Sequence, residues 1–420
     1  MPPLSRREFL AASAGLVHLP MPGIRREVFL TSPAKRVAIM AYAFYTRHRG
    51  GDMISIEQRW SRSDTIDVAY FRRSQDYGQT WSMPLEVRTG ERRPEGMLRR
   101  HPRFGFVDAR TRRYIEFWIE GVLPTDDPLE GLRNWNIFYR ISRDGGHRFG
   151  PPFQVVHAGA EFDGRHPLPG VWTGKNSAML GDMTSVPVVT SGGHILLPIE
   201  ISPLGADGKL YNPTGAYTYT DAAILDGRWR GDRLEWEMSQ VIQGDPAHST
   251  RGMVEPTIEF LDDGRLLMVL RGSNDRRPEL PSWRWVAFSS DGGRRWTHPE
   301  PWTYDTGEPF FSPSACSRLL RHSSGRLFWL GNITAENPRG NRPRFPFVIG
   351  EVDRRTARLM RSSVRTVDTL QPGEDPILSL SNFYAREDRR TREISVHMTR
   401  LFAHPEGWAG DAYLYRITPL

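Results

Sequence analysis

The sequence contains very little cysteine, no long apolar run and no recognisable metal motif. Its single cysteine, Cys316, excludes an internal disulfide, so the chain depends on packing for its stability. No stretch of about eighteen apolar residues occurs, so we expect no membrane-spanning segment. The twelve histidines show no spacing such as H-E-x-x-H, so we expect neither a metal nor another cofactor.

Lysine is also scarce, although the net charge is +7. The lysines are Lys35, Lys175 and Lys209, so arginine carries nearly all of the positive charge, and acidic residues are interleaved with it. No basic block or nucleic-acid motif accompanies the charge, which favours a compositional bias over a nucleic-acid partner. A mildly positive field would still attract an anionic substrate.

The N-terminus carries a candidate targeting signal. Residues 5–10 read Ser-Arg-Arg-Glu-Phe-Leu, which resembles the twin-arginine export motif, and an apolar stretch follows to Met21. We therefore expect export to the periplasm or the medium, with residues 1–30 as signal and leader and residues 31–420 as one domain. A chance arginine pair is the alternative. No clear cleavage site follows, so retention or anchoring of the segment stays open, and the oligomeric state leaves no signal.

A short motif repeats three times. Ser74–Trp81, Ser142–Phe149 and Ser289–Trp296 all fit S-x-D-x-G-x-x-[WF], the Asp-box. In such a turn the aspartate accepts hydrogen bonds from backbone amides and the glycine allows a positive φ. The aromatic residue packs at the base of the hairpin, so we interpret these motifs as structural.

The spacing of the motifs predicts the fold class. Asp76 and Asp144 are 68 residues apart, the next gap to Asp291 is 147, and Asp353 follows 62 residues later in a degenerate copy. A period near 65 predicts an all-β, six-bladed β-propeller in which the blade between Asp144 and Asp291 lacks the motif. The last blade lacks an outer strand, which residues 27–30 are expected to supply.

The predicted topology gathers polar side chains at one mouth of the central channel. In each blade the third strand ends on the face that carries the repeated turns. The first strand begins, and the second ends, on the opposite face. That opposite face is predicted to hold Arg59, Asp64, Glu255, Arg271, Asn332, Arg344, Tyr384 and Arg400. A cluster of arginines, carboxylates and a tyrosine at one channel mouth is the expected site.

With the repeated turns, this set of residues resembles the bacterial exo-sialidases over nearly the whole chain after Leu30. Glu255 and Arg271 are sixteen residues apart, and Arg59 precedes Asp64 by five, as in that family. The resemblance implies a retaining exo-glycosidase that acts on sialic acid or a related acidic glycan.

The resemblance also implies a role for each residue. Arginines bind the sugar carboxylate through their planar, bidentate fork. A tyrosine serves as the nucleophile because a carboxylate would be repelled by the substrate. The implied catalytic residues are Tyr384 as nucleophile, Glu255 as its base and Asp64 as acid/base. The implied substrate-binding residues are Arg59, Arg271 and Arg344.

Several alternatives remain at the level of sequence. Asp67 is an alternative to Asp64 as the acid/base, and Arg342 is an alternative to Arg344 in the arginine clamp. Phe383 lies next to Tyr384, so an error of one position in the strand register would change the predicted nucleophile. The third clamp arginine of the family has Arg36 as its one candidate, so the clamp is expected to be incomplete. A non-catalytic glycan-binding propeller, and a propeller hydrolase or lyase acting on uronic-acid polysaccharide, are the competing functions.

Overall fold

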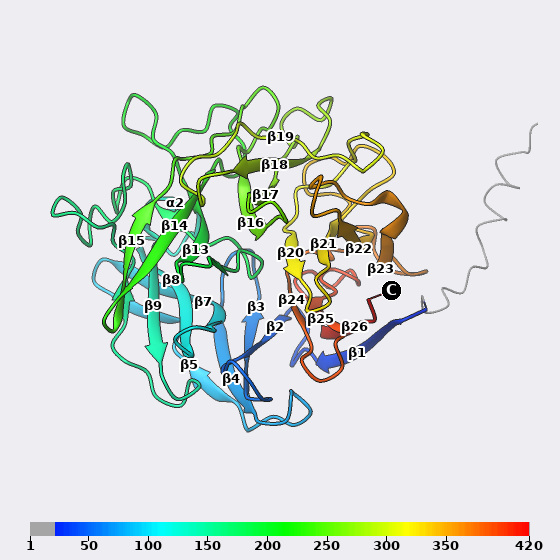
Figure 1. The fold of residues 1–420 in the computed structure, drawn as a ribbon, viewed down its shortest axis with the longest axis horizontal. Helices are drawn as coiled ribbons and strands as arrows, with labels where there is room; N and C mark the ends of the chain where they lie inside the picture. The colour runs from blue at the N-terminus through cyan, green and yellow to red at the C-terminus, as the bar shows by residue number, and fades with distance from the viewer. Residues whose placement is uncertain (1–21, 420) are drawn as a thin grey trace, which may run out of the picture.

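The computed structural model describes residues 22–419, within which the strands form six antiparallel sheets arranged in a ring (Figure 1). This confirms the six-bladed β-propeller predicted from the turn spacing. The predicted export signal, with its arginine pair and the apolar stretch that follows to Met21, lies outside the described residues. No helix within residues 22–419 is long and apolar enough to cross a membrane.

The first three sheets follow one another along the chain. In the second, a short strand β6 is added beside the inner strand β7, and in the third the inner strand is broken into β11 and β12, which both pair with β13. The strands of these sheets are β2 (Ala38–Tyr45), β3 (Met53–Trp60), β4 (Val68–Ser74) and β5 (Leu85–Val87); β6 (Gly90–Arg93), β7 (Gly96–Asp108), β8 (Arg113–Leu123), β9 (Asn136–Ser142) and β10 (Phe153–Gln154); and β11 (Ala178–Met179), β12 (Val188–Val189), β13 (Ile195–Ile201), β14 (Asp221–Arg230) and β15 (Arg233–Met238).

The other three sheets each have four strands, and short helices occur in two connecting loops. These strands are β16 (Val254–Phe260), β17 (Leu266–Arg271), β18 (Arg284–Ser289) and β19 (Glu300–Pro301); β20 (Arg318–Arg321), β21 (Leu327–Asn332), β22 (Phe347–Val352) and β23 (Arg365–Asp368); and β24 (Phe383–Glu387), β25 (Ile394–Thr399), β26 (Ala412–Ile417) and β1 (Ile24–Leu30). The helices are η1 (Pro128–Glu130), α2 (Gly131–Asn134) and η2 (Arg361–Ser363).

The N-terminal strand closes the ring, as the sequence predicted. β1 pairs antiparallel with β26, with Ile24 opposite Ile417 and Glu27 opposite Leu414, and the two strands lie side by side in Figure 1. The propeller therefore begins at Ile24. The sequence division at residue 30 placed this strand with the leader, and its pairing assigns it to the sixth blade instead.

The three repeated turns occupy equivalent places, after the third strands β4, β9 and β18 of the first, second and fourth sheets. Each makes the same hydrogen bonds. In the first, Ser74 Oγ donates to Asp76 Oδ1 at 2.7 Å, and the amide of Thr80 donates to the same oxygen at 2.9 Å. Asp353 follows the third strand β22 of the fifth sheet and accepts from the amide of Arg355 at 2.9 Å. The turn period therefore counted blades correctly.

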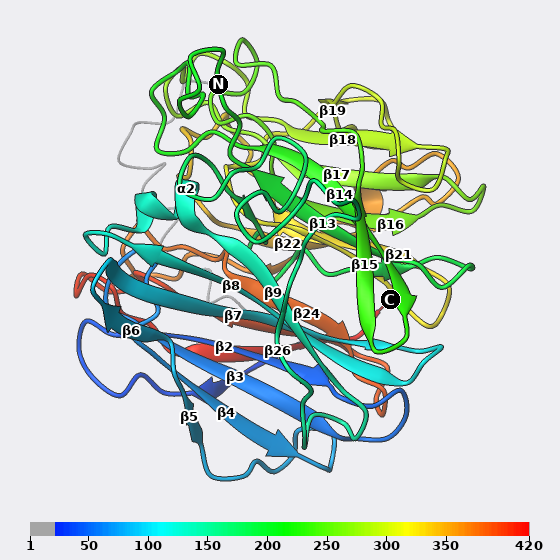
Figure 2. The ribbon, with the colours of Figure 1, turned by 90° about the vertical axis from the view of Figure 1, so that its left-hand side faces the viewer.

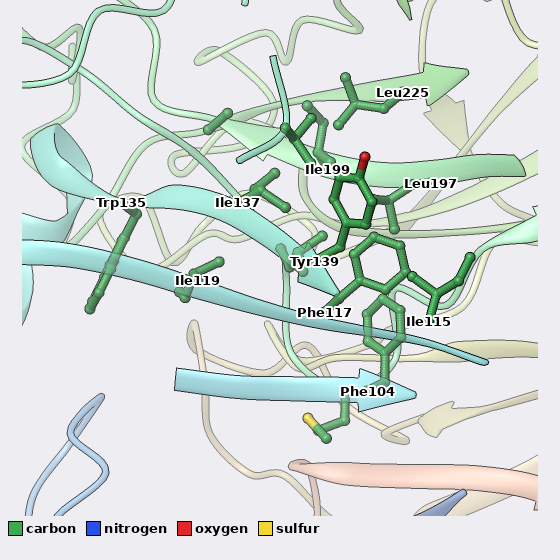
Figure 3. Close-up of a cluster of buried hydrophobic side chains, with 14 of the residues drawn as sticks. Phe104, Ile115, Phe117, Ile119, Trp135, Ile137, Tyr139, Leu197, Ile199 and Leu225 are labelled. Carbon is green, nitrogen blue, oxygen red and sulfur yellow. The ribbon is translucent and has the colours of Figure 1, made fainter. Parts of the chain in front are cut away.

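The second strand of most blades is buried along its whole length. Every residue of β13, β17, β21 and β25 is buried, because each sheet packs between two neighbouring sheets. Three of these strands, β13, β17 and β21, therefore begin with continuous apolar runs, whereas β25 buries the alternating sequence Ile-Ser-Val-His-Met-Thr. Figure 3 shows part of the resulting core, in which side chains of β7, β8 and β9 meet those of β13 and β14.

Strand register separates the two faces of the ring. In the fourth sheet Arg271 pairs with Arg284 at one end, while Leu266 pairs with Ser289 at the other, where the turn of Asp291 begins. The repeated turns thus lie opposite the end of β17 and the start of β16. Figure 2 shows α2 on the same side of the ring as those strand ends.

Candidate active site

A cavity of about 530 Å³ opens at the mouth of the channel opposite the repeated turns. All six blades contribute to its walls, from Met40 of the first to Asn382 of the sixth. Its size is typical of a site for a small ligand. Of the predicted site residues, those that line it are Asp64, Glu255, Arg271 and Arg344.

Three arginines gather on one wall of the cavity. Arg271, at the end of β17, donates from Nη1 to Glu255 Oε2 at 2.7 Å and from Nε to Ser314 Oγ at 2.8 Å. Arg344 donates from Nη2 to the carbonyl of the same serine at 2.8 Å. Arg251 also lines the cavity and is buried. We call these three residues the arginine cluster.

The arginine cluster carries more positive charge than its partners neutralise. Among the described residues, Arg271 forms an ion pair with Glu255, whereas Arg251 and Arg344 form none. Burial, followed by repulsion from Arg271, lowers the pKa of both Arg251 and Arg344 to about 10. Both therefore remain charged at neutral pH, and the wall is suited to binding an anion.

Backbone irregularity directs Glu255 toward the cavity. A register shift between Val254 and Thr257 interrupts the pairing of β16 with β17, and Glu255 adopts a left-handed backbone with φ of 47°. β-Bulges often re-aim side chains beside active sites, and a non-glycine residue with positive φ is held there by its surroundings. The irregularity places this carboxylate against Arg271.

A second carboxyl group, Glu200 of β13, lies directly behind Glu255. Glu200 Oε1 accepts from the Glu255 amide at 3.0 Å, and Oε2 accepts from Thr220 Oγ1 at 3.2 Å. Burial, with the charge of Glu255, raises the pKa of Glu200 to about 7. Burial would also raise the pKa of Glu255, but the charge and hydrogen bond of Arg271 hold it below its usual value. The pair thus combines an ionised carboxylate with a carboxyl group that keeps its proton to a higher pH than an ordinary glutamate.

We expect Glu200→Gln to remove a pH-dependent loss of stability. Between pH 4.5 and 7 Glu200 loses its proton in the unfolded chain but retains it in the folded protein. The contribution of Glu200 to the free energy of unfolding is therefore present at low pH and is lost as the pH rises. A glutamine reproduces the protonated form, with Oε1 accepting from the Glu255 amide. Relative to wild type, the variant should gain about 3 kcal/mol in unfolding free energy between pH 4.5 and 8.

Urea unfolding at the two pH values measures this difference. Glu308→Gln is the matched control, because Glu308 is exposed and its variant should follow the wild-type pH dependence. Parallel curves for wild type and Glu200→Gln would contradict a raised pKa at Glu200.

A third carboxylate, Asp182, lines the cavity beside Asn382 of the sixth blade. Asn382 Nδ2 donates to Asp182 Oδ2. Burial raises the pKa of Asp182, Arg103 opposes this, and the charge of Glu255 adds to it, while the Met183 amide and Asn382 stabilise the ionised form. Asp182 therefore combines a raised pKa with a position inside the cavity, the properties that general acid–base catalysis uses.

Asp64 lies at the exposed rim of the same cavity, in the loop after β3. Its Oδ2 accepts from Ser63 Oγ at 2.6 Å and from the hydroxyl of Tyr217 at 3.3 Å. The competing Asp67 instead accepts from the Ser61 amide at 2.7 Å and does not line the cavity. The structure thus places Asp64, rather than Asp67, at the site.

Tyr384 does not reach the cavity, and the nucleophile role assigned to it lacks geometric support. Its side chain belongs to the hydrophobic core, with its ring 4.6 Å from that of Phe44 in an edge-on contact. The guanidinium of Arg318 lies 4.6 Å from the ring centroid. Asn382, two residues earlier and just before β24, lines the cavity instead. The sequence interpretation therefore chose a residue too deep in the channel.

Arg59 also lies outside the cavity. Its guanidinium forms an ion pair with Glu57 at 3.1 Å and lies 4.6 Å from the ring centroid of Tyr70. Its side chain therefore faces Glu57 and Tyr70 within the first sheet, and it neither lines the cavity nor contacts Asp64.

The remaining arginine alternatives are also placed. Arg36 is exposed with φ of 59° and does not line the cavity, whereas Met40 of the same blade does. Arg342 lines the cavity at its exposed rim, so Arg344 is the member of the pair that joins the arginine cluster. Arg400 is buried in ion pairs with Asp368 and Glu374.

The sequence interpretation missed Arg251, Asp182 and Glu200. Arg251 precedes β16 in a loop and belongs to none of the matched spacings. Glu200 lies within the mainly apolar strand β13. Its raised pKa results first from burial, which no spacing in the sequence reveals. Asp182 lies between the two short inner strands of the blade that lacks a repeated turn, so neither a motif nor strand alternation identifies it.

Comparisons with known proteins show the fold. No protein-family model matches the chain, and no curated protein matches it. A structure of unknown function from Dyadobacter fermentans matches with a TM-score of 0.61 and 15% identity, over 95% of this chain and 100% of that one. The NanB sialidase from Streptococcus pneumoniae matches with a TM-score of 0.59 and 11% identity, over 99% and 72%.

An α-L-arabinofuranosidase from Fusarium graminearum matches with a TM-score of 0.51 and 14% identity, over 93% of this chain and 96% of that one. At these identities the likeness concerns the fold. The chain is similar in architecture both to sialidases and to arabinan-processing propellers, and its own cavity residues must carry any argument about function.

Proposed function

We propose that the protein is a glycoside hydrolase that acts on a sugar bearing a carboxylate or a similar anionic group. The observation that carries this proposal is the arginine cluster, Arg251, Arg271 and Arg344, in a cavity that also contains carboxyl groups suited to acid–base chemistry. Structural similarity to sialidases and an arabinofuranosidase supports the reaction class.

The arginine cluster binds the anionic group of the sugar in this proposal. Glu255 keeps Arg271 oriented through its 2.7 Å ion pair, and Ser314 fixes both Arg271 and Arg344. Planar guanidinium groups hold a carboxylate through paired hydrogen bonds, which orients the sugar as well as attracting it. The sugar is thereby held with its anomeric carbon among the cavity carboxylates.

The chemistry is assigned to carboxylates, because Tyr384 lies outside the cavity. Asp64, exposed at the rim, donates a proton to the leaving oxygen. Asp182, which also lines the cavity, acts as a base on a water molecule at the opposite side of the anomeric carbon, because the sugar carboxylate would repel a carboxylate that attacked directly. This assignment replaces the tyrosine mechanism of the sialidase resemblance and keeps its acidic substrate.

The first test is a screen with umbelliferyl glycosides of sialic acid, glucuronic acid and galacturonic acid, with the neutral arabinofuranoside as comparison. We expect turnover of one acidic glycoside and little or none of the neutral sugar. Binding of acidic sugars without turnover of any of them would contradict the hydrolase and favour a glycan-binding propeller.

Arg344→Lys should weaken binding of the acidic sugar. Lysine keeps the positive charge but loses the bidentate fork, and a lost hydrogen bond to a charged group costs about 1.5–3 kcal/mol, or roughly 10- to 150-fold in affinity. Isothermal titration with the free sugar product measures the change. Arg342→Lys at the exposed rim is the control and should bind within about threefold of wild type. Equal losses in both variants would contradict a specific role of the arginine cluster.

A further inference from the structure

The carboxylate of Asp64 is held on one of its two oxygens. Ser63 Oγ and the Tyr217 hydroxyl both donate to Oδ2, at 2.6 and 3.3 Å, whereas no described residue donates to Oδ1. Such an arrangement fixes the plane of the carboxylate and leaves one oxygen free for proton transfer. Asp64 and Tyr217 come from the first and third blades, so this contact crosses the front of the second blade.

The backbone beside Asp64 is anchored independently of Tyr217. Arg62 donates to Asp126 Oδ2 at 2.9 Å, and Arg99 makes two 2.6 Å hydrogen bonds to the same carboxylate. Asp64 itself has a left-handed backbone with φ of 52°. These contacts fix where the loop lies, so the hydrogen bonds from Ser63 and Tyr217 determine how the Asp64 side chain is turned.

The segment that carries Tyr217 is in turn tied to the arginine cluster. The next residue, Thr218, accepts a hydrogen bond from Arg251 Nη2, and Thr214 Oγ1 donates to the carbonyl of Thr250 at 2.5 Å. Tyr217 is about half exposed and lines the cavity. One short segment therefore contacts the residue proposed to protonate the leaving group and an arginine proposed to bind the sugar.

We propose that Tyr217 is a positioning residue, which orients the Asp64 carboxylate for proton transfer to the leaving oxygen through its hydrogen bond to Oδ2. This inference rests on the proposed acid/base role of Asp64. Tyr217 acts through Asp64 and not on the substrate, so its removal should affect only those steps that need the Asp64 proton.

The experiment compares Tyr217→Phe, Asp64→Asn and the double variant on two glycosides of the preferred acidic sugar. A phenyl glycoside has a poor leaving group that needs protonation, whereas a 4-nitrophenyl glycoside needs it far less. We expect Tyr217→Phe to lower kcat on the phenyl glycoside about tenfold, with little change on the 4-nitrophenyl glycoside and KM within twofold. In the Asp64→Asn background the same change should have no further effect.

Tyr211→Phe is the matched control, since Tyr211 belongs to the same loop, is similarly exposed and donates no hydrogen bond from its hydroxyl to a described residue. It should match wild type on both substrates. Equal losses on the two substrates in Tyr217→Phe, a change in KM alone, or an undiminished loss in the Asp64→Asn background would overturn the positioning role. If Asp64→Asn itself shows no leaving-group dependence, the acid/base role of Asp64 fails, and a wild type without turnover overturns both proposals.

A second measurement tests the contact without relying on activity. Burial, together with the charge of Asp64, raises the pKa of Tyr217 to about 12. Carbon-13 NMR of ring-labelled tyrosine, with the resonance assigned from Tyr217→Phe, follows its titration. We expect Asp64→Asn to lower this pKa, whereas an unchanged pKa would show that the hydroxyl does not contact Asp64 in solution and would overturn the inference.

Discussion

Asp182→Asn should lower kcat on an acidic aryl glycoside by at least about a hundredfold, because the side chain proposed to act at the anomeric carbon loses its charge and its basicity. The substitution keeps the oxygen that accepts the hydrogen bond from Asn382, so the fold should be retained. Affinity for the free sugar should stay within a few-fold of wild type, since the arginine cluster is unchanged. Steady-state kinetics and isothermal titration on the same preparation measure the two effects.

The sharpest comparison is with Tyr384→Phe. A tyrosine nucleophile would lose all activity in that variant, whereas a core tyrosine outside the cavity should leave kcat within a few-fold of wild type. Collapse of turnover in Tyr384→Phe, with normal activity in Asp182→Asn, would reverse our assignment and restore the sialidase mechanism.

Arg400→Met should cause a large loss of stability although it lies away from the site. Arg400 is 4% exposed and donates from Nη2 to Glu374 Oε1 at 2.6 Å, while its Nη1 bonds Asp368. Removing one member of a buried ion-pair network leaves uncompensated charges, so we expect the unfolding free energy to fall by about 3–5 kcal/mol. Urea unfolding at pH 7 measures the loss.

Arg230→Met provides the control for Arg400→Met. Arg230 forms an ion pair with Glu235 at 3.0 Å, and the two side chains are 64% and 40% exposed. Solvent screens such a pair, so its removal should cost less than about 1 kcal/mol. Similar losses in the two variants would show that the buried network around Arg400 contributes no more than a surface pair.

The fold could be predicted from the sequence because its signal is local and repeated. Each repeated turn needs its serine, aspartate and glycine within eight residues, and the hydrogen bonds of Ser74 and Asp76 show why. Counting such turns gives the number of blades without knowledge of any long-range contact. The pairing of residues 27–30 with the last strand could be predicted for the same reason, since a sheet with a missing outer strand requires one.

The site could be predicted only in part, because side-chain depth along the channel is not a local property. Glu255 and Arg271 were identified because their spacing matches the sialidase pattern, and the pairing of β16 with β17 fixes that spacing. Tyr384 lies in β24 and Asn382 just before it, and Asn382 reaches the cavity whereas Tyr384 packs in the core. Arg251 and Asp182 enter from loops, whose paths depend on contacts between blades.

The pairing of β1 with β26 has a consequence for how the molecule acquires its shape during synthesis. The first five sheets are built from strands that follow one another in the chain, so each can form as soon as its own residues are available. The sixth cannot, because its outer strand is made first and its neighbour last, and closing it joins residues almost 400 positions apart. Until then β1 is an unpaired strand edge, open to pairing with other chains.

Because the amide of Thr418 donates to the Gly23 carbonyl at 2.8 Å, a short linker between these positions would allow a circular permutant opened at the exposed turn of Gly231. In such a permutant the strands of the sixth sheet would be consecutive in the chain. The third sheet would instead be divided, because β15 would be made first and β14 last, so β15 would be the strand that stays unpaired during synthesis.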